Sequence, residues 1–164
     1  MGAQIIIRVF KLAEDGIRPQ FEALIHKHWC AVQQRFGEEE FSLNWQLLEN
    51  IERMGMGCFL GAFKDSRLIG YYASMFVPSL HTKGLKIAQD LGWFVDPMER
   101  AGGAGIRLLD LMEEIAAFNG CRENAISIKI LKNDAPERLL ARRGYLKSEH
   151  RHTKQLKNIG GEYA

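Results

Sequence analysis

The most informative segment of this sequence reads Val95-Asp96-Pro97-Met98-Glu99-Arg100-Ala101-Gly102-Gly103-Ala104-Gly105-Ile106. It places three glycines between a strand-like stretch at residues 87–95 and an amphipathic stretch at residues 106–119, which predicts a strand, a tight turn and a helix. Glycines let a ligand approach the backbone, and a helix start offers unpaired N–H groups with partial positive charge. The segment is therefore a candidate site for a phosphate or pyrophosphate, with a plain structural corner as the alternative.

Two common phosphate-binding loops do not fit this segment. The P-loop requires Gly-Lys-Ser/Thr, and neither a lysine nor a hydroxyl stands at the required place. The dinucleotide pattern G-x-G-x-x-G fails because Leu108 occupies the position of its third glycine. The pattern that does fit is R-x-x-G-x-G, formed by Arg100, Gly103 and Gly105.

Hydrophobic periodicity predicts the remaining elements. Before the glycines we expect a strand at residues 3–12, a helix at 19–36, a helix between Ser42 and Gly55, and a hairpin of strands 58–63 and 67–77. After them we expect a helix at 106–119, a strand at 125–131, a helix at 134–143 and a last strand at 145–156. This order predicts an α+β fold in which one mixed, mostly antiparallel sheet of about six to seven strands is flanked by helices.

Length and composition bound the class of protein. The 164 residues, of which 46% are hydrophobic and 26% charged, predict a single folded domain over residues 1–164. The net charge of +2 is too small to mark a dedicated nucleic-acid or membrane-surface protein. Charge is uneven, however, because residues 129–157 hold nine basic and three acidic side chains.

Neither a membrane span nor a metal site is expected. The apolar stretches fall short of the roughly 20 residues that a spanning helix needs, and no basic segment precedes the first apolar one, so we expect a cytoplasmic protein. The three cysteines Cys30, Cys58 and Cys121 are far apart, which favours free thiols over a disulfide framework or structural zinc. His150 and His152 share a strand face but lack a third ligand. His26 and His28 do not share a helix face, and we expect both to be exposed to solvent.

The Arg100, Gly103 and Gly105 pattern, which follows a strand ending in Val95-x-Pro97, resembles the acyl-CoA signature of the GNAT superfamily of N-acetyltransferases. The likeness covers nearly the whole chain, since Asn133 and the pair Gly144-Tyr145 stand at the separations usual in that family. The segment 139–156 also resembles small acetyltransferases encoded in tailed-phage genomes.

The resemblance implies a GNAT-like fold in which the strand before the glycines splays from its parallel neighbour and acetyl-CoA lies in the gap as a co-substrate. By this resemblance, acyl-CoA would be bound by the backbone of the splayed strand, by the backbone of the turn and by the Arg100 side chain. The residues involved are Phe94, Val95, Arg100, Ala101, Gly102, Gly103, Ala104, Gly105 and Ile106. Asn133 would contact the pantetheine arm or else cap the next helix. No metal is implied.

The resemblance also implies direct transfer of the acetyl group to a primary amine, without a covalent enzyme intermediate. The family commonly carries a tyrosine acid four residues before the Gly-aromatic pair, but Leu140 occupies that position here. Three interpretations stay open: another donor replaces the tyrosine, the thiolate leaves unaided, or catalysis is lost. A thiol of pKa near 8.5 is a fair leaving group, which favours the first two.

Two residues are candidates for the base that deprotonates the amine. Asp90 lies on the strand that leads to the predicted splay, two residues before Gly92, and the period of a strand predicts that both face the same side. His81, in the loop at residues 78–85, is the other candidate. A surface role for Asp90 is the alternative.

The acceptor cannot be read from these residues. The expected partners are an acyl-CoA and an amine carried by a small molecule or a protein. The runner-up functions are a nucleic-acid-associated protein, suggested by the basic segment 129–157, and a catalytically degenerate binding protein of GNAT fold. The sequence does not determine the oligomeric state, and a dimer is compatible with it.

Overall fold

The computed structural model describes residues 4–33, 40–128 and 135–148 of the chain. Its strands are β1 (Ile5–Val9), β2 (Gly57–Lys64), β3 (Arg67–Pro78), β4 (Lys86–Val95) and β5 (Cys121–Ala125). Its α-helices are α1 (Ile17–His28), α2 (Trp45–Arg53), α3 (Ala104–Phe118) and α4 (Ala135–Arg142). A π-helical turn, η1 (Trp29–Gln33), extends α1, and a 3-10 helix, η2 (Pro97–Gly102), joins β4 to α3.

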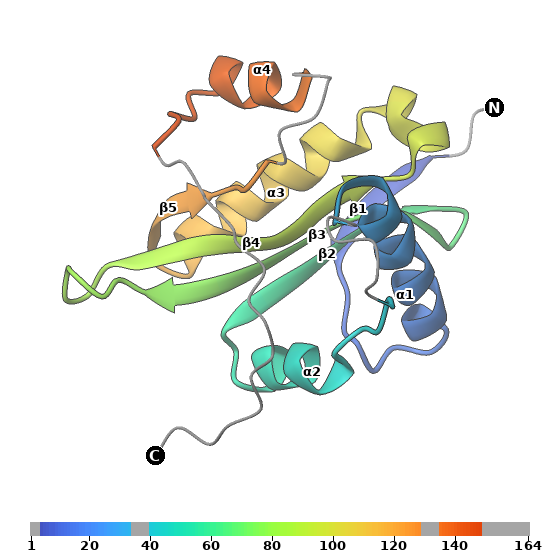
Figure 1. Cartoon of the computed structure of the whole chain (residues 1–164), viewed down its shortest axis with the longest axis horizontal. Helices are drawn as coiled ribbons and strands as arrows, with labels where there is room; N and C mark the ends of the chain where they lie inside the picture. Colours follow the sequence, from blue (N-terminus) through green and yellow to red (C-terminus); the bar gives the residue numbers. More distant parts are fainter. Residues whose placement is uncertain (1–3, 34–39, 129–134, 149–164) are drawn as a thin grey trace.

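The five strands form one sheet in the order β1-β2-β3-β4-β5. Neighbours from β1 to β4 are antiparallel, whereas β4 and β5 are parallel because α3 carries the chain back between them (Figure 1). The predicted mixed, mostly antiparallel sheet is thus confirmed.

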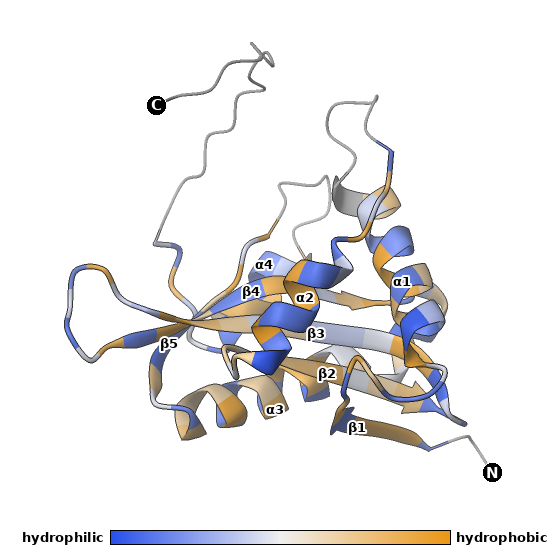
Figure 2. Ribbon diagram, turned by 90° about the horizontal axis from the view of Figure 1, so that it is seen from below, coloured by the Kyte–Doolittle hydropathy of each residue, from blue (hydrophilic) through white to orange (hydrophobic). Residues whose placement is uncertain are grey.

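Helices cover both faces of the sheet, with α3 on one face and α1 and α2 on the other (Figure 2). Alternation along the strands divides the buried side chains into two cores. The α3-side core includes Leu60, Tyr72, Val95, Leu108 and Met112. The α1-side core is rich in aromatic rings and includes Phe10, Phe21, Phe59, Tyr71 and Phe94.

Three predicted helices are close to the observed ones. The apolar stripe predicted for residues 106–119 is buried in the structure, and α3 begins two residues earlier, at Ala104. The helix expected after Ser42 begins at Trp45, because the Asn44 side chain accepts a hydrogen bond of 3.0 Å from the Leu47 N–H and caps it. The helix expected at 134–143 is α4.

The predicted helix over 19–36 is shifted relative to α1. Gly16, with φ of 69°, precedes the helix, which begins at Ile17 and ends at His28. Only a π-helical turn continues it as far as Gln33. The first strand is likewise shorter than the predicted 3–12, because β1 ends at Val9.

The strand predicted at 125–131 is not observed at residues 126–128, and residues 129–131 lie outside the described residues. The strand that pairs with β4 is β5, at Cys121–Ala125, while Ile126 and Ile128 pack on the α3-side core outside any strand. Of the last predicted strand, 145–156, residues 145–148 are not in a strand and the rest lie outside the described residues. The described residues therefore hold five strands instead of the expected six to seven.

Candidate functional site

A gap opens in the sheet between β4 and β5. Their parallel pairing runs from Lys86 and Cys121 to Gln89 and Ala125, whereas β4 continues to Val95. The last six residues of β4 are thus hydrogen-bonded to β3 on one side and extend past the end of β5 on the other. This geometry confirms the splayed parallel pair expected from the sequence.

A bulge in β4 lies where the gap begins. Ser74 of β3 pairs with Asp90, but the preceding Ala73 pairs with Gly92, so Leu91 is an extra residue in β4. Because paired residues face the same side of a sheet, Asp90 faces the α3 side and Gly92 the α1 side. The expectation that these two residues face the same side is wrong, since the bulge shifts the alternation by one residue.

The main chain of β4 presents polar groups to the gap. The Asp96 N–H donates a hydrogen bond of 2.9 Å to the Ile69 carbonyl of β3. Antiparallel alternation then directs the main-chain groups of Phe94 toward β3 and those of Trp93 and Val95 toward the gap. The Val95 carbonyl accepts a hydrogen bond of 3.1 Å from Arg100 Nε, which leaves its N–H facing the gap.

The glycine turn brings the start of α3 to the end of β4. Gly103 adopts the left-handed conformation, with φ of 68°, and precedes the helix without a side-chain cap. The N–H groups of the first helical turn therefore remain available to an anion. Trp93 Nε1 donates a hydrogen bond of 3.1 Å to the Gly105 carbonyl, which fixes this turn against β4.

The residues predicted to bind acyl-CoA thus occupy one continuous region at the end of β4. It contains Phe94, Val95, Arg100 and the turn residues Ala101 to Ile106. The Arg100 guanidinium also lies 5.7 Å from the centre of the Phe94 ring, over the α1-side end of the strand. Asn133 lies outside the described residues, as do His150 and His152.

A polar pair that the sequence analysis missed lies on the α1 side of β4. The Nδ1 atom of His28 and the hydroxyl of Tyr71 are 2.6 Å apart. The imidazole stacks on the Phe94 ring, with centroids 4.8 Å apart and an interplanar angle of 13°. His28 is half-buried, so the expectation of full exposure is wrong, whereas His26 is exposed as expected.

An ion pair joins the same helix to the end of β4. Lys27 Nζ lies 2.6 Å from Asp96 Oδ2, and the Asp96 side chain is only 10% exposed. The other oxygen of Asp96 accepts a hydrogen bond of 3.2 Å from the Met98 N–H at the start of η2. The hydrogen bond from Lys27 lowers the pKa of Asp96 against the opposing effect of burial.

The two predicted catalytic residues lie apart. Asp90 is at the start of the gap, where Oδ1 accepts hydrogen bonds from the Ser127 N–H at 3.0 Å and from Gln89 Nε2 at 3.1 Å. His81 is exposed in the turn that closes the β3–β4 hairpin, at the end opposite Val95 (Figure 1). Asp90 lies four residues into β4 from this hairpin end, which is about 13 Å along the strand at ~3.3 Å per residue.

Leu140, at the position of the family tyrosine, is buried in the α3-side core. Beside it a hydrogen-bonded chain links three elements: Tyr72 donates to Asn124 Oδ1 at 3.1 Å, Asn124 Nδ2 donates to the Tyr145 hydroxyl at 2.7 Å, and Tyr145 donates to Glu113 Oε1 at 2.8 Å. Burial raises the pKa of Tyr145 above its ordinary value. This chain holds the residues after α4 against α3 and β5.

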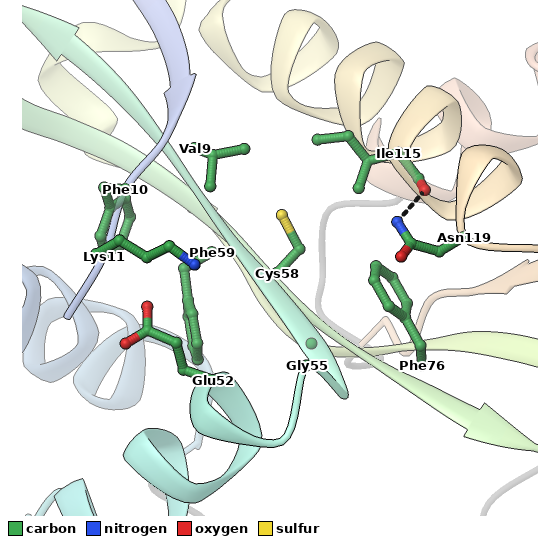
Figure 3. Close-up of a pocket in the computed structure, with 11 residues that line it drawn as sticks. Val9, Phe10, Lys11, Glu52, Gly55, Cys58, Phe59, Phe76, Ile115 and Asn119 are labelled. Carbon is green, nitrogen blue, oxygen red and sulfur yellow. Dashed lines mark hydrogen bonds between the residues drawn. The ribbon is translucent and has the colours of Figure 1, made fainter.

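A cavity of about 240 Å³ lies away from the gap, between the end of β1, β2 and α2 (Figure 3). Lys11 and Glu52 stand on one side of it, and the Cys58 thiol points between Val9 and Ile115 (Figure 3). Burial raises the pKa of Cys58 to about 11, so the thiol is protonated at neutral pH. The cavity includes none of the predicted site residues.

The part of the chain that the structure describes has neither a metal-binding cluster nor a membrane-spanning helix. There, no three His, Cys, Asp or Glu side chains are grouped in a way that could hold a metal ion. Within the same ranges, every helix is too short or too polar to cross a membrane. Most of the basic segment 129–157 lies outside the described residues, and within it Arg143 and Lys147 form ion pairs with Asp110 and Glu137.

Comparison with known families gives one match, to the acetyltransferase (GNAT) family, over residues 21–145. This range includes the gap, the glycine turn and the His28–Tyr71 pair. A search of curated protein sequences finds no match.

Solved structures of similar fold cover almost the whole chain. A ribosomal-protein-alanine N-acetyltransferase from Brucella melitensis biovar Abortus 2308 has a TM-score of 0.70 at 16% identity, over 93% of this chain and 99% of that one. A transcriptional regulator from Bacillus halodurans C-125 has a TM-score of 0.73 at 19% identity, over 94% and 100%. AAC(6')-Iy in complex with the bisubstrate analogue CoA-S-monomethyl-acetylneamine has a TM-score of 0.69 at 17% identity, over 94% and 99%. At these identities the likeness shows the fold alone.

Proposed function

Since this chain belongs to the acetyltransferase (GNAT) family, we propose that it is an N-acetyltransferase that moves the acetyl group of acetyl-CoA directly to a primary amine. The observation that carries the proposal is the gap between β4 and β5, which opens beside the uncapped start of α3. A long, thin thioester with a pyrophosphate at one end matches that combination of an open strand and a helix N-terminus.

In this proposal the chain holds acetyl-CoA mainly by its backbone. The N–H groups at the start of α3 bind the pyrophosphate, and Gly103 and Gly105 leave those groups accessible. The main-chain groups of Trp93 and Val95 that face the gap bind the pantetheine arm as a further strand would. The CoA-containing analogue bound to AAC(6')-Iy, a protein of the same fold, supports this assignment.

The proposed reaction forms one bond and breaks another. The amine nitrogen attacks the thioester carbonyl, the C–N bond forms, and the C–S bond breaks with its electron pair on sulfur. As the amide forms, the attacking nitrogen loses a proton to a base or to solvent, and the thiolate takes a proton from solvent. The amide and CoA are then released. Because a thiolate of pKa near 8.5 leaves readily, the reaction tolerates an apolar residue at Leu140.

We infer that Asp90 positions β5 in this reaction. Its carboxylate accepts the Ser127 N–H just after β5 ends, so it fixes the point at which the two strands part. The sequence-based assignment of Asp90 or His81 as the base stays a prediction.

The proposal is tested by incubating the protein with acetyl-CoA and a panel of amines. The panel contains glucosamine, an aminoglycoside, a lysine-containing peptide and a peptide that begins with alanine. Mass spectrometry should detect one acetylated product together with free CoA, and calorimetry should detect CoA binding. If CoA does not bind and no amine is acetylated, the proposal is wrong; if CoA binds without transfer, the chain is a binding protein of this fold.

A further inference from the structure

The pair formed by His28 and Tyr71 is polar but lies among apolar side chains. Tyr71 is only 3% exposed and packs edge-on against the Phe21 ring, with centroids 5.2 Å apart. Its hydroxyl and His28 Nδ1 are 2.6 Å apart, which is short for a hydrogen bond between neutral groups. Packing alone does not require a hydroxyl here, because phenylalanine would fill the same space.

Gly92 allows the Tyr71 hydroxyl to reach the gap. Tyr71 pairs with Phe94, but its side chain extends diagonally over Gly92, where a Cβ would lie 2.7 Å from the hydroxyl oxygen. Any other residue at this position would displace the hydroxyl. Gly92 belongs to the part of β4 that extends beyond the pairing with β5, so the hydroxyl lies over the α1-side face of β4, next to the gap.

His28 is held in place from two sides. The Phe94 ring stacks on the imidazole, and the Lys27–Asp96 ion pair fixes the end of α1 to the end of β4. Among the described residues, the charged side chains near the pair include Lys27 of α1, Asp90 of β4, Asp96 between β4 and η2, and Arg100 of η2.

We propose that Tyr71 and His28 together take the proton from the acceptor amine, with Tyr71 in contact with the amine and His28 acting through Tyr71. This inference rests on the proposed acetyl transfer. As the ammonium N–H bond breaks, its proton passes to the Tyr71 oxygen, and the Tyr71 proton passes to His28 Nδ1. The neutral amine then attacks the thioester, and its second proton reaches the thiolate through solvent. His28 returns its proton to solvent after the product leaves.

The electrostatics of Tyr71 agree with this relay. Burial raises the pKa of Tyr71 well above its ordinary value, and the charge of Asp90 acts in the same direction. The Tyr71 hydroxyl therefore stays protonated and relays the proton by accepting one as it donates another. The His28 imidazole is the group that accepts the proton, because imidazole titrates near neutral pH. The two atoms are already within hydrogen-bond distance, so the transfer between them requires no rearrangement.

The first test compares Tyr71→Phe and His28→Gln with matched controls. Tyr72→Phe removes a hydroxyl that is equally buried but bonded to Asn124 on the α3 side, and His26→Gln changes the exposed histidine two positions earlier. CoA affinity is measured by calorimetry, and single-turnover transfer is followed from pH 5 to 9 with the fastest amine of the panel.

We expect both relay variants to bind CoA within about twofold of the wild type and to transfer acetyl about 10² to 10⁴ times more slowly at neutral pH. They should also lose the rise in rate that accompanies imidazole deprotonation, between about pH 5 and 8. The controls should keep both the rate and the pH profile. Relay variants that keep the wild-type rate and profile would overturn the inference while leaving acetyl transfer intact.

A second test needs no acceptor. The His28 imidazole is titrated by NMR in the wild type and in Tyr71→Phe. If the Tyr71 hydroxyl donates to the neutral imidazole, removing it should raise the pKa of His28, because the hydrogen bond favours the uncharged form. A pKa that falls or stays the same would contradict the relay, even if the panel contained no active amine.

Discussion

The Lys27 ammonium lies 2.6 Å from the Asp96 carboxylate, and this contact joins the last turn of α1 to the residue that follows β4. Asp96 also caps η2 through the Met98 N–H. An ionised carboxylate therefore helps to hold the last turn of α1, and with it His28, against the end of β4.

The pH dependence of stability should report this ion pair. The pKa of Asp96 is lower in the folded than in the unfolded chain. The ionised carboxylate therefore contributes fully to the free energy of unfolding above about pH 4, and this contribution is lost as the pH falls through the pKa of Asp96 in the folded protein. Asp96→Asn should lower the free energy of unfolding by about 0.5 to 1 kcal/mol at pH 7, and the difference from the wild type should shrink toward pH 2.5. Urea unfolding at both pH values measures this, with Glu49→Gln, which removes the exposed ion pair with Arg18, as the control. A difference that does not vary with pH would contradict the assignment.

Binding of CoA should depend on the absence of side chains at Gly103 and Gly105. Valine at position 103, where φ is 68°, would project into the open space at the start of α3 and would strain the turn. Valine at position 105 would press against Val95 and Trp93 and displace the first turn of α3 from β4. We expect calorimetry to show a loss of affinity of at least about 100-fold, or ~2.7 kcal/mol. Gly120→Val is the matched control, since Gly120 has φ of 79° at the other end of α3 and no atom within 4 Å of an added Cβ. It should lose stability but keep CoA affinity, and undiminished affinity in the double variant would rule out this binding site.

The sequence predicts those features that depend on neighbouring residues. The apolar stripe of α3 and the glycines before it predict the helix start to within two residues of Ala104. The turn at residues 64–66 predicts the β2–β3 hairpin, because a short polar turn joins two apolar runs. β5 is different: its sequence, Cys-Arg-Glu-Asn-Ala, carries little apolar pattern, and the β-branched residues just after it point to the wrong segment.

The His28–Tyr71 pair could not be predicted from the sequence, because it joins residues 43 positions apart. The bulge at Leu91 cannot be predicted from the sequence either, because it depends on how β4 pairs with Ala73 and Ser74 of β3. One signal was available: a glycine inside an apolar strand often marks a close approach of another group, and Gly92 does so here.

Substitutions at Asp90 and His81 should separate positioning from proton transfer. Asp90→Asn keeps an oxygen that can accept the Ser127 N–H, so its transfer rate should fall by less than about tenfold, whereas Asp90→Ala should lose more rate and some stability. His81→Ala, at the far end of the hairpin, should leave the rate unchanged. Stopped-flow transfer assays at pH 6 to 9 measure these effects. If Asp90→Asn lowered the rate by 10² to 10⁴ with intact CoA affinity, Asp90 would be the base, as the sequence predicts.

Tyrosine at position 140 should destabilise the protein without speeding acetyl transfer. Leu140 is 6% exposed and packs in the α3-side core, so Leu140→Tyr would force a larger, polar side chain into a filled space. Overpacking of this kind costs about 1 to 3 kcal/mol, which corresponds to a drop in melting temperature of about 2 to 12 °C for a chain of this size. Leu146→Tyr, at an 89% exposed position shortly after α4, is the control and should melt like the wild type. Calorimetric melting and the acetyl-transfer assay are measured on the same samples. A Leu140→Tyr protein with wild-type stability and a rate more than tenfold higher would show that the phenol reaches the leaving thiolate and that protonation of this group limits the reaction.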